Sequence, residues 1–407
     1  MKIVQKFGGT SVADISKIRS AAKRVKSEVE RGNQVIVVVS AMAGVTNQLI
    51  SYCQEFPSNY NMREYDVVVS AGEQITSGLM SIALQDLNIG SVSLLGWQIP
   101  IFTNDAHAKA LIDSIDTLKI LDHLDKGEVV VVPGFQGVTK NREIVTLGRG
   151  GSDITAVALA VSVSADYCDI YTDVDGVYTS DPRIVKKAKK IDKITYEEML
   201  EMASLGAKVL QTRSVELAMK FDIPLRVLSS FSSGPGTLIC SEEEVVEKEV
   251  VSGIAHSMDE AKITLVSVED RPGIAASIFH TLSEHNINVD MIVQNVSEDG
   301  STDLTFTVSK LELLSAKGAI ENNKEIKWRK LLTDNDVSKV SVVGVGMKSH
   351  AGVAMTMFKA LAEKNINIEV ISTSEIKVSV LIKANFTQEA LICLHDAFGL
   401  DQCKDSS

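Results

Sequence analysis

Short apolar runs alternate with helical patterns through roughly the first 240 residues. The apolar runs lie at 2–7, 34–40, 91–95, 128–132 and 168–172. Their β-branched composition, apolar on both faces, is typical of a parallel sheet that is covered on both sides. Alternating strands and helices therefore predict an α/β sandwich with a mainly parallel sheet.

Three helical patterns lie between or after these runs. Apolar residues recur at helical spacing over 15–29, and the pattern ends at Gly32. Residues 154–164, ITAVALAVSVS, are apolar nearly all round, which favours a buried helix over a strand. A third helical pattern covers 195–219.

The composition changes after this region. Residues 232–236, SSGPG, are rich in turn formers, and residues 241–250, SEEEVVEKEV, form a charge run typical of a solvated surface. Together they predict a domain boundary.

The chain then repeats itself. The segment PGIAASIFHTLSEHNINVDMIVQNVS, which starts at Pro272, is similar to AGVAMTMFKALAEKNINIEVISTSE, which starts at Ala351. Strand-like runs precede the copies at 262–268 and 339–345 and follow them at 302–308 and 377–382. Two amphipathic helices can look alike by chance, but the shared Asn-Ile-Asn turn and the equal flanks indicate a tandem repeat that pairs into one regulatory module.

Composition and charge narrow the class of protein. The 407 residues are 45% hydrophobic and 23% charged, with a formal net charge of -12, which indicates a folded chain of two or three domains. An acidic balance argues against nucleic acid as the main partner. Five scattered cysteines without a CxxC pair suggest neither a disulfide framework nor a zinc site. We expect no membrane span and no signal peptide, and therefore a cytoplasmic protein.

The first chemical motif, KFGGTS, directly follows the first predicted strand. Its two glycines allow a backbone to approach an anion, and Lys6 adds a positive charge. Such a Gly-Gly pair is also common in plain turns. The chain has no GxxxxGK[ST] and no GxGxxG sequence, which disfavours a P-loop protein and a dinucleotide-binding turn.

The second motif, LGRGGSD at 147–153, precedes the buried helical pattern. Arg149 offers a bidentate fork for a carboxylate, beside three glycines and Ser152. Asp153 could serve as an ordinary helix cap, but the neighbouring arginine and glycines favour an anion site.

Further polar elements follow predicted strands. TDVDGVY at 172–178, with DPR at 181–183, would lie at the carboxyl edge of a parallel sheet, where ligands bind. SAMAGVT at 40–46 and SAGE at 70–73 are placed similarly. Glu73 lies inside an apolar helical pattern, so it either faces solvent or binds an amine.

These motifs, in this order and together with GFQG at 134–137, resemble the aspartate kinases of the amino-acid kinase superfamily, and the repeat resembles paired ACT domains. The resemblance implies a carbamate-kinase-like three-layer α/β/α sandwich with a mainly parallel sheet at 1–240. A linker at 241–261 and two ferredoxin-like βαββαβ ACT domains, at 262–332 and 333–407, would follow. TDVDG-Y is shared across the superfamily, whereas KFGGTS, SAGE and LGRGGSD together are specific to aspartate kinases.

The implied reaction transfers the γ-phosphoryl group of ATP to the side-chain carboxylate of L-aspartate, the first step of lysine, threonine and methionine synthesis. Lys6 would neutralise phosphate charge, and Asp153 would organise the cations and the incoming carboxylate. Mg²⁺ would be coordinated by phosphate oxygens and water, without a protein ligand. The implied ATP-binding residues are Lys6, Gly8, Gly9, Thr172, Asp173, Tyr178, Asp181, Arg183 and Lys208. The implied aspartate-binding residues are Ser40, Thr46, Glu73, Phe135, Arg149 and Ser152.

The resemblance also implies inhibition by lysine, threonine or both. The effector positions are Asp270, Gly273, Ile274, Ala275, Asn288, Asp290, Gln294, Met347, His350, Val353, Asn367 and Ile368. The family often has proline at the position of Ala351, so the second loop departs from the family pattern. A homodimer or higher oligomer through the ACT domains is expected, and a shorter regulatory subunit from an internal start such as Met258 stays open.

Two other classes compete with a regulated aspartate kinase. The chain could be a catalytically silent amino-acid sensor, or an amino-acid kinase with a different acceptor. Intact motifs around Lys6, Arg149, Asp153 and Asp181 disfavour the first, and SAGE together with LGRGGSD disfavours the second.

Overall fold

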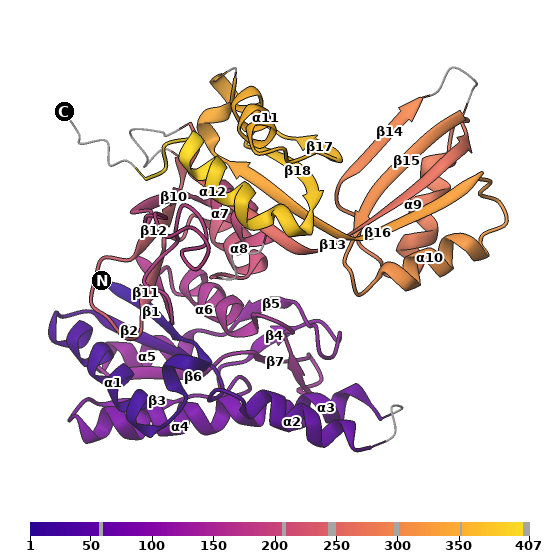
Figure 1. Cartoon of the computed structure of the whole chain (residues 1–407). Helices are drawn as coiled ribbons and strands as arrows, with labels where there is room; N and C mark the ends of the chain where they lie inside the picture. The colour runs from indigo at the N-terminus through magenta and orange to yellow at the C-terminus, as the bar shows by residue number, and fades with distance from the viewer. Residues whose placement is uncertain (57–59, 206–208, 243–249, 297–300, 351, 402–407) are drawn as a thin grey trace. The chain divides into compact units, whose positions relative to one another are not determined.

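The computed structural model describes residues 1–56, 60–205, 209–242, 250–296, 301–350 and 352–401. The chain divides into two compact units. The amino unit contains Met1–Val177, Lys190–Ala203 and residues 209–242. The carboxyl unit contains Tyr178–Lys189, residues 204–205 and the residues from 250 onward. Figure 1 labels the helices and strands of both units.

The amino unit is built on an eight-stranded sheet with the order β10-β12-β11-β9-β1-β2-β6-β3. Its strands are β1 (Lys2–Phe7), β2 (Gln34–Val39), β3 (Ser91–Ser93), β6 (Val129–Pro133), β9 (Tyr167–Thr172), β10 (Lys193–Thr195), β11 (Leu225–Ser229) and β12 (Thr237–Cys240). All neighbouring pairs are parallel except β11 and β12. The predicted mainly parallel sheet is confirmed, and each of the five predicted strands lies in it.

Helices cover both faces of this sheet. On one face, α1 (Ile15–Glu30) and α4 (Ala71–Asp86) share a core with Phe7 and Val37. On the other, α6 (Gly151–Ser162) packs against β1 and β9, and most of its residues are buried. The predicted buried helix is therefore confirmed. The remaining helices are α2 (Val45–Gln54), α3 (Met62–Val69), α5 (Leu118–Asp125), α7 (Tyr196–Ser204) and α8 (Thr212–Phe221).

The third helical pattern differs from its prediction. One helix was expected over 195–219, whereas the structure has α7 and α8 as separate helices. Gly206 interrupts the apolar periodicity of this segment in the sequence, and glycine is a poor residue for a helix interior.

A smaller four-stranded sheet, with the order β5-β4-β7-β8, also belongs to the amino unit. Its strands are β4 (Ile101–Thr103), β5 (Ile112–Ile115), β7 (Gln136–Val138) and β8 (Ile144–Thr146). They are too short to show a clear alternation, so the sequence did not predict them. The antiparallel β7–β8 pair brings Phe135 and Leu147 together, and the Leu147 amide donates to the Phe135 carbonyl at 2.9 Å.

The helices α3 and α4 follow each other so closely that Met62–Asp86 is long and apolar enough to pass as a membrane span by composition. However, 56% of its most apolar window is buried inside the structure. It also contains Asp66 and Glu73, both buried. These features are those of core helices rather than of a lipid-facing segment.

The carboxyl unit has a six-stranded antiparallel sheet with the order β14-β15-β13-β16-β18-β17. The strands are β13 (Gly253–Glu269), β14 (Ile292–Val296), β15 (Ser301–Val308), β16 (Lys330–Val343), β17 (Val370–Thr373) and β18 (Lys377–Lys383). The helices are α9 (Ile274–Glu284), α10 (Leu313–Asn322), α11 (Val353–Glu363) and α12 (Thr387–Ala397). Each half of the sheet has its own apolar core, one with α9 and α10 and the other with α11 and α12.

The two repeats place matching residues at matching positions. Gly273 and Gly352 precede α9 and α11 with φ of 92° and 113°, a conformation that favours glycine. Asn286 and Asn365, the first asparagines of the Asn-Ile-Asn turns, follow these helices with φ of 55° and 54°. The same local backbone at both ends confirms that the sequence similarity reflects a structural repeat.

The long strand β13 serves both repeats. Its beginning pairs with the end of β16, Gly253 with Val343, whereas Ile263 and Leu265 pair with both β15 and β16 in the first repeat. The structure thus places Gly253 and the residues up to 261 in a strand, where the sequence suggested a linker. The beginning of β13 thus serves as the fourth strand of the second repeat, although it precedes the first repeat in the chain. The sequence could not predict this, because the pairing joins segments that are distant in sequence.

The segment Tyr178–Lys189 belongs to the carboxyl unit, although it precedes the boundary expected near residue 240. Val185 lies in the core of the second repeat. The Ile254 amide donates to the Thr179 carbonyl at 2.7 Å, and the Thr179 hydroxyl lies 3.0 Å from Nε2 of the buried His395. Packing, rather than sequence order, therefore divides the chain.

Candidate active site

A buried ion pair lies where the carboxyl end of β1 meets the amino end of α6. Lys6 Nζ lies 2.6 Å from Asp153 Oδ1, and the two side chains are 11% and 10% exposed. Lys6 reaches α6 because side chains alternate across a strand, while its neighbour Phe7 packs on the α1 face. Asp153 is the third residue of α6, and the N-cap is Gly150, so Asp153 is not the capping residue.

Two glycines shape the space beside this pair. A Cβ on Gly8 would lie 3.4 Å from Lys6 Nζ, and a Cβ on Gly9 would lie 3.0 Å from the Ala41 carbonyl oxygen. Glycine at position 8 keeps a side chain away from the ammonium group, and glycine at position 9 keeps one away from the Ala41 carbonyl. The Gly8 amide, which was expected to donate to a phosphate, donates to the Tyr171 carbonyl at 3.2 Å, so Gly8 contributes to the site through the space it leaves beside Lys6 rather than through its N–H.

Glu73 is a second buried carboxylate, in the first turn of α4. Its residue is 3% exposed, and Oε1 accepts a hydrogen bond from the Ala41 amide at 3.1 Å. Oε2 has no hydrogen-bond partner among the described residues. Burial raises the pKa of Glu73 from 4.5 to about 7. The solvent-facing alternative is therefore wrong, and the free oxygen is suited to a cationic ligand.

The loop between β8 and α6 carries Arg149. Arg149 is exposed, and no hydrogen bond or ion pair joins its side chain to a described residue. It lies between Gly148 and Gly150, with φ of 75° and 70°. Ser152 is buried against Gly134, which has no room for a Cβ. The guanidinium thus stays available for an incoming anion.

Other expected aspartate-binding residues lie in the same unit. Phe135 has a φ of 69°. Its amide donates a hydrogen bond to the Thr155 hydroxyl at 3.2 Å, which fixes the backbone at this position. Ser40 follows β2, and its amide donates to the Phe7 carbonyl at 3.1 Å. Thr46 is the second residue of α2. The amino unit therefore contains each residue that the sequence assigned to aspartate.

The expected nucleotide residues are divided between the units. Thr172 and Asp173 follow β9 in the amino unit, and the Thr172 hydroxyl donates to Asp173 Oδ1 at 3.1 Å. Tyr178, Asp181 and Arg183 lie in the carboxyl unit. Lys208 lies outside the described residues.

Asp181 and Arg183, two residues apart in the chain, form a bidentate ion pair. Arg183 Nε lies 3.0 Å from Asp181 Oδ1, and Arg183 Nη2 lies 2.7 Å from Asp181 Oδ2. The hydrogen bonds from Arg183 lower the pKa of Asp181. Asp181 is therefore held as an anion beside its arginine.

The sequence did not predict the contacts that hold the β8–α6 loop and the segment beside it. Asp66 on α3 accepts from Thr146, His107 and Ala108, and Arg213 on α8 donates to the Leu147 carbonyl at 3.0 Å. The one signal for Asp66 was an acidic residue inside an apolar helical pattern, the same signal that singled out Glu73.

The expected effector residues cluster at matching places in the two repeats. Gly273, Ile274 and Ala275 start α9, and Val353 starts α11. Asn288 and Asn367 are exposed beyond the helix ends, Gln294 lies in β14, and Asp270 precedes α9. Met347 and His350 lie in the loop after β16, and Ile368 follows Asn367. The residue Ala351 lies outside the described residues.

Ion pairs cross between the repeats in a reciprocal pattern. Asp290 follows the first Asn-Ile-Asn turn and pairs with Lys339 on β16, which also lies 3.1 Å from Glu260. Glu369 follows the second turn and pairs with Lys262 on β13. The acid of each repeat thus binds a lysine on the first strand of the other, so Asp290 already has a cationic partner.

Among the residues that the structure describes, no three histidine, cysteine, aspartate or glutamate side chains are grouped so that they could hold a metal ion. Asp153 offers carboxylate oxygens beside the space next to Gly8. This donor set fits a cation that brings phosphate and water ligands with it better than a cation held by protein ligands alone.

Comparison with known proteins defines the class first. The amino acid kinase family matches residues 1–229, and ACT domains match residues 262–325 and 340–398. An amino acid kinase with paired ACT domains is thus the architecture of this chain.

Individual relatives narrow the class. The chain is 54% identical to an aspartate kinase of Pseudomonas putida, over 98% of both chains. It is 50% identical to an aspartokinase of Helicobacter pylori, over 99% of this chain and 100% of that one. Two crystal structures of E. coli aspartokinase III, one with aspartate and ADP and one with lysine and aspartate, each match with a TM-score of 0.79 and 27% identity. They cover 98% and 97% of this chain, and 99% of each structure is matched.

The chain therefore belongs to the aspartate kinase family, and it is an enzyme that transfers a phosphoryl group to a carboxyl group. This excludes the catalytically silent sensor, and its ACT domains are of the regulatory kind that occurs in this family.

Proposed function

We propose that the chain transfers the γ-phosphoryl group of ATP to the side-chain carboxylate of L-aspartate, which gives 4-phospho-L-aspartate and ADP. The single observation that carries this proposal is the pairing of Lys6 with Asp153 at 2.6 Å in the unit that also holds Glu73 with its unpartnered oxygen. The aspartate and ADP bound to E. coli aspartokinase III support the same substrates.

The reaction needs charge neutralisation more than proton transfer. The aspartate carboxylate is already an anion, so one of its oxygens attacks the γ-phosphorus while the bond to the oxygen bridging to the β-phosphorus breaks. Lys6 would stabilise charge on the transferring group, beside the space that Gly8 leaves open. Asp153 would keep Lys6 oriented and would organise the cations that bring the incoming carboxylate to the phosphate.

Three groups are suited to select aspartate. Arg149 would bind the α-carboxylate through its planar fork, and Glu73 would bind the ammonium group. Burial keeps water away from Glu73, so a cation that reaches its free oxygen gains more than it would at the surface. Ser40, Thr46 and Ser152 would add hydrogen bonds, and Phe135 would wall the pocket.

Mg²⁺ belongs to the proposal as the partner of ATP. Bound to the phosphate oxygens, it would neutralise charge on the β- and γ-phosphates. Thr172, Asp173, Tyr178, Asp181, Arg183 and Lys208 remain the proposed nucleotide residues, with Lys6, Gly8 and Gly9.

A coupled assay of ADP release tests the function. The purified chain should release ADP from Mg-ATP only when L-aspartate is added, and glutamate, acetylglutamate and UMP should not replace it. Release with one of these acceptors but not with aspartate would contradict the proposal.

Lysine, threonine or both are the proposed inhibitors, and the aspartate family pathway is the proposed context. The lysine in the T-state structure of E. coli aspartokinase III supports an amino-acid effector. The matching loops after β13 and β16 offer two related places for one. The ADP-release assay, repeated with each amino acid and with both, should show inhibition. Full activity at millimolar lysine plus threonine would contradict this part.

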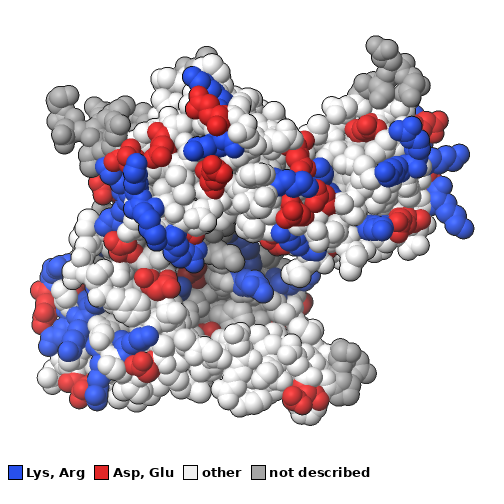
Figure 2. Space-filling view, viewed as in Figure 1, with Lys and Arg blue, Asp and Glu red and all other residues white. Residues whose placement is uncertain are grey.

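We expect a cytoplasmic homodimer or higher oligomer that associates through the ACT repeats, with a shorter regulatory subunit as an open alternative. A nucleic-acid partner is not expected. Figure 2 shows lysine and arginine interspersed with aspartate and glutamate on the face in view, rather than gathered into one basic surface.

A further inference from the structure

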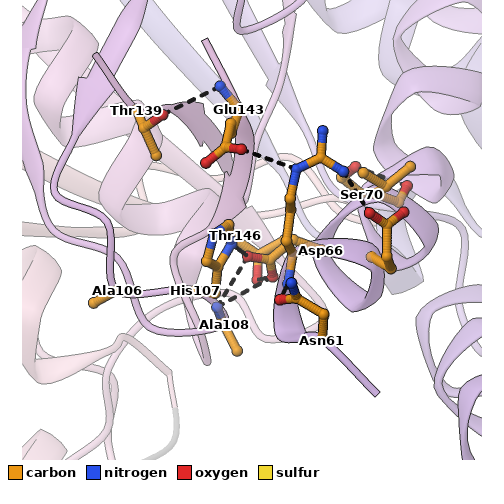
Figure 3. Close-up of polar contacts among 12 residues, drawn as sticks. Asn61, Asp66, Ser70, Ala106, His107, Ala108, Thr139, Glu143 and Thr146 are labelled. Carbon is orange, nitrogen blue, oxygen red and sulfur yellow. Dashed lines mark hydrogen bonds and ion pairs between the residues drawn. The ribbon is translucent and has the colours of Figure 1, made fainter. Parts of the chain in front are cut away.

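A buried carboxylate on α3 holds the chain segments beside the loop of Arg149. Asp66 is fully buried and accepts hydrogen bonds from the Thr146 hydroxyl at 2.6 Å, from His107 Nδ1 at 2.7 Å and from the Ala108 amide at 3.1 Å. Figure 3 shows these three donors converging on the Asp66 carboxylate. One side chain thus connects three separate parts of the amino unit.

Two of these contacts lie next to the LGRGGSD loop. Thr146 is the last residue of β8 and precedes Arg149 by three positions. Ala108 has a φ of 64°, and its carbonyl oxygen lies against Gly148, where an added Cβ would be only 3.1 Å away. Asp66 therefore anchors both the strand that leads into the loop and the segment on which the loop rests.

A guanidinium group from α8 holds the same two segments. Arg213 Nη1 donates to the Leu147 carbonyl at 3.0 Å, and Arg213 Nη2 donates to the Ala110 carbonyl at 3.4 Å. The Ala110 amide in turn donates to the Thr146 carbonyl at 2.9 Å. The backbone that leads into Gly148 and the neighbouring segment at Ala110 are thereby restrained, while the Arg149 side chain stays exposed.

The helix that carries Asp66 leads directly into the helix that carries Glu73. Ser70 ends α3 and precedes α4, and its carbonyl accepts from Gln136 Nε2 at 3.2 Å. One continuous helix pair therefore holds the free carboxylate of Glu73 and, through Asp66, the loop of Arg149.

We infer that Asp66, with Thr146 and His107, is a positioning element that sets Arg149 for the α-carboxylate of the amino-acid substrate. The inference rests on the proposed function of Arg149. Because the helix pair also carries Glu73, it would fix the spacing between the two groups that bind the two charged ends of aspartate. Loss of the hydrogen bonds to Asp66 should therefore weaken aspartate binding and leave ATP binding unchanged.

Thr146→Val is the central test, because it removes one hydroxyl and keeps the shape. We expect the KM for aspartate to rise about tenfold, as for the loss of one hydrogen bond to a buried carboxylate, while kcat and the KM for ATP stay within about twofold. An unchanged KM for aspartate would overturn the inference.

Arg63→Ala is the matched control. Arg63 lies on the same helix, and its Nε donates to Glu143 Oε1 in the β7–β8 hairpin at 3.0 Å rather than to a partner of Asp66. It should leave all three kinetic constants within about twofold. An equal rise in the KM for aspartate would mean that any loosening of the hairpin has this effect, which would also overturn the inference.

Two Asp66 variants separate positioning from folding. In Asp66→Asn, the remaining oxygen can accept from Thr146 and Ala108, and the amide can face His107 if its Nδ1 becomes an acceptor. This variant should keep a KM for aspartate near that of the wild type, whereas Asp66→Ala should raise it about tenfold or more. Equal damage in both would contradict a hydrogen-bond role.

A double-mutant cycle with Arg149→Ala shows whether the effect passes through Arg149. In that background, Thr146→Val should change the KM for aspartate by less than about twofold, because the group being positioned is gone. The same tenfold rise in both backgrounds would overturn the inference. A wild-type enzyme without ADP release on aspartate would instead contradict the proposed function and this inference with it.

Discussion

Two buried carboxylates of the amino unit, Asp153 and Glu73, have opposite surroundings. Asp153 lies 2.6 Å from the ammonium group of Lys6, and no comparable cation lies beside Glu73 among the described residues. One oxygen of the Glu73 carboxylate accepts a hydrogen bond from the Ala41 amide, and the other oxygen has no partner among the described residues. Burial raises the pKa of Glu73 to about 7. Both are 10% exposed or less.

The difference shows how burial can prepare a site in two ways. An opposite charge offsets part of the desolvation cost of a buried charge, so Lys6 already balances the charge of Asp153 before a ligand arrives, although Asp153 Oδ1 accepts no hydrogen bond from a described residue. An unpaired buried carboxylate destabilises the fold until a cation reaches it, so Glu73 is prepared for a ligand that brings its own positive charge. The first arrangement suits catalysis, and the second suits recognition of an amine.

Removing the cation of the Lys6–Asp153 pair should have the largest effect. Lys6→Ala leaves Asp153 buried without its partner and leaves the transferring phosphoryl group without this positive charge. We expect kcat to fall about 10²–10³-fold in the ADP-release assay. Lys2→Ala, on the same strand, is the control and should keep near-normal turnover. A near-normal kcat in Lys6→Ala would remove Lys6 from the chemistry.

Removing the unpaired charge should stabilise the fold. Between pH 4.5 and about 7 the folded state binds more protons at Glu73 than the unfolded state, so this group lowers stability as the pH rises. At pH 8 the penalty is complete, and Glu73→Gln should raise the free energy of unfolding by up to about 3 kcal/mol. Urea unfolding should show this gain at pH 8 and little gain at pH 5. An exposed counterpart, Glu55→Gln, should show neither.

Arg149 provides the anion-binding counterpart to Glu73. Arg149→Ala should raise the KM for aspartate roughly 10–100-fold and change the KM for ATP by less than about twofold. Arg142→Ala, an exposed arginine of the preceding β7–β8 turn, is the matched control. Equal changes in the two KM values of Arg149→Ala would count against a clamp on aspartate.

The pH dependence of aspartate binding gives the smallest and most specific effect. Glu73 can hold an ammonium group only when it is ionised, and its pKa in the free enzyme is raised to about 7. The affinity for aspartate should fall about tenfold from pH 8 to pH 6, and Glu73→Gln should bind weakly at both values. Calorimetric titration measures this. A wild-type affinity that is the same at pH 6 and pH 8 would contradict the role of Glu73 in binding the ammonium group of aspartate.

Much of the fold could be predicted from local patterns. Strands such as β1 and β2 have long β-branched runs, and α6 is apolar on every side, so their type is evident from the sequence. The repeat was visible because the two copies share a glycine, Gly273 or Gly352, before the helical pattern and an Asn-Ile-Asn turn after it. The short strands β4, β5, β7 and β8 offered no such signal, because three or four residues do not make a periodicity.

The candidate site could be predicted in part for the same reason. Lys6, Arg149 and Asp153 lie in glycine-rich motifs that a sequence displays directly. Asp66 and Arg213 act through contacts with residues far away in the chain, and no motif marks them.

The sequence by itself determined the parallel α/β unit, the tandem repeat and the family, because these follow from local periodicity and contiguous motifs. Only the tertiary structure decided three further matters. It placed Tyr178–Lys189 in the carboxyl unit, gave β13 to both repeats, and distinguished the paired Asp153 from the unpaired Glu73. Each depends on which distant segments come into contact and how far they exclude water, and burial and pairing are properties of those contacts rather than of any one residue.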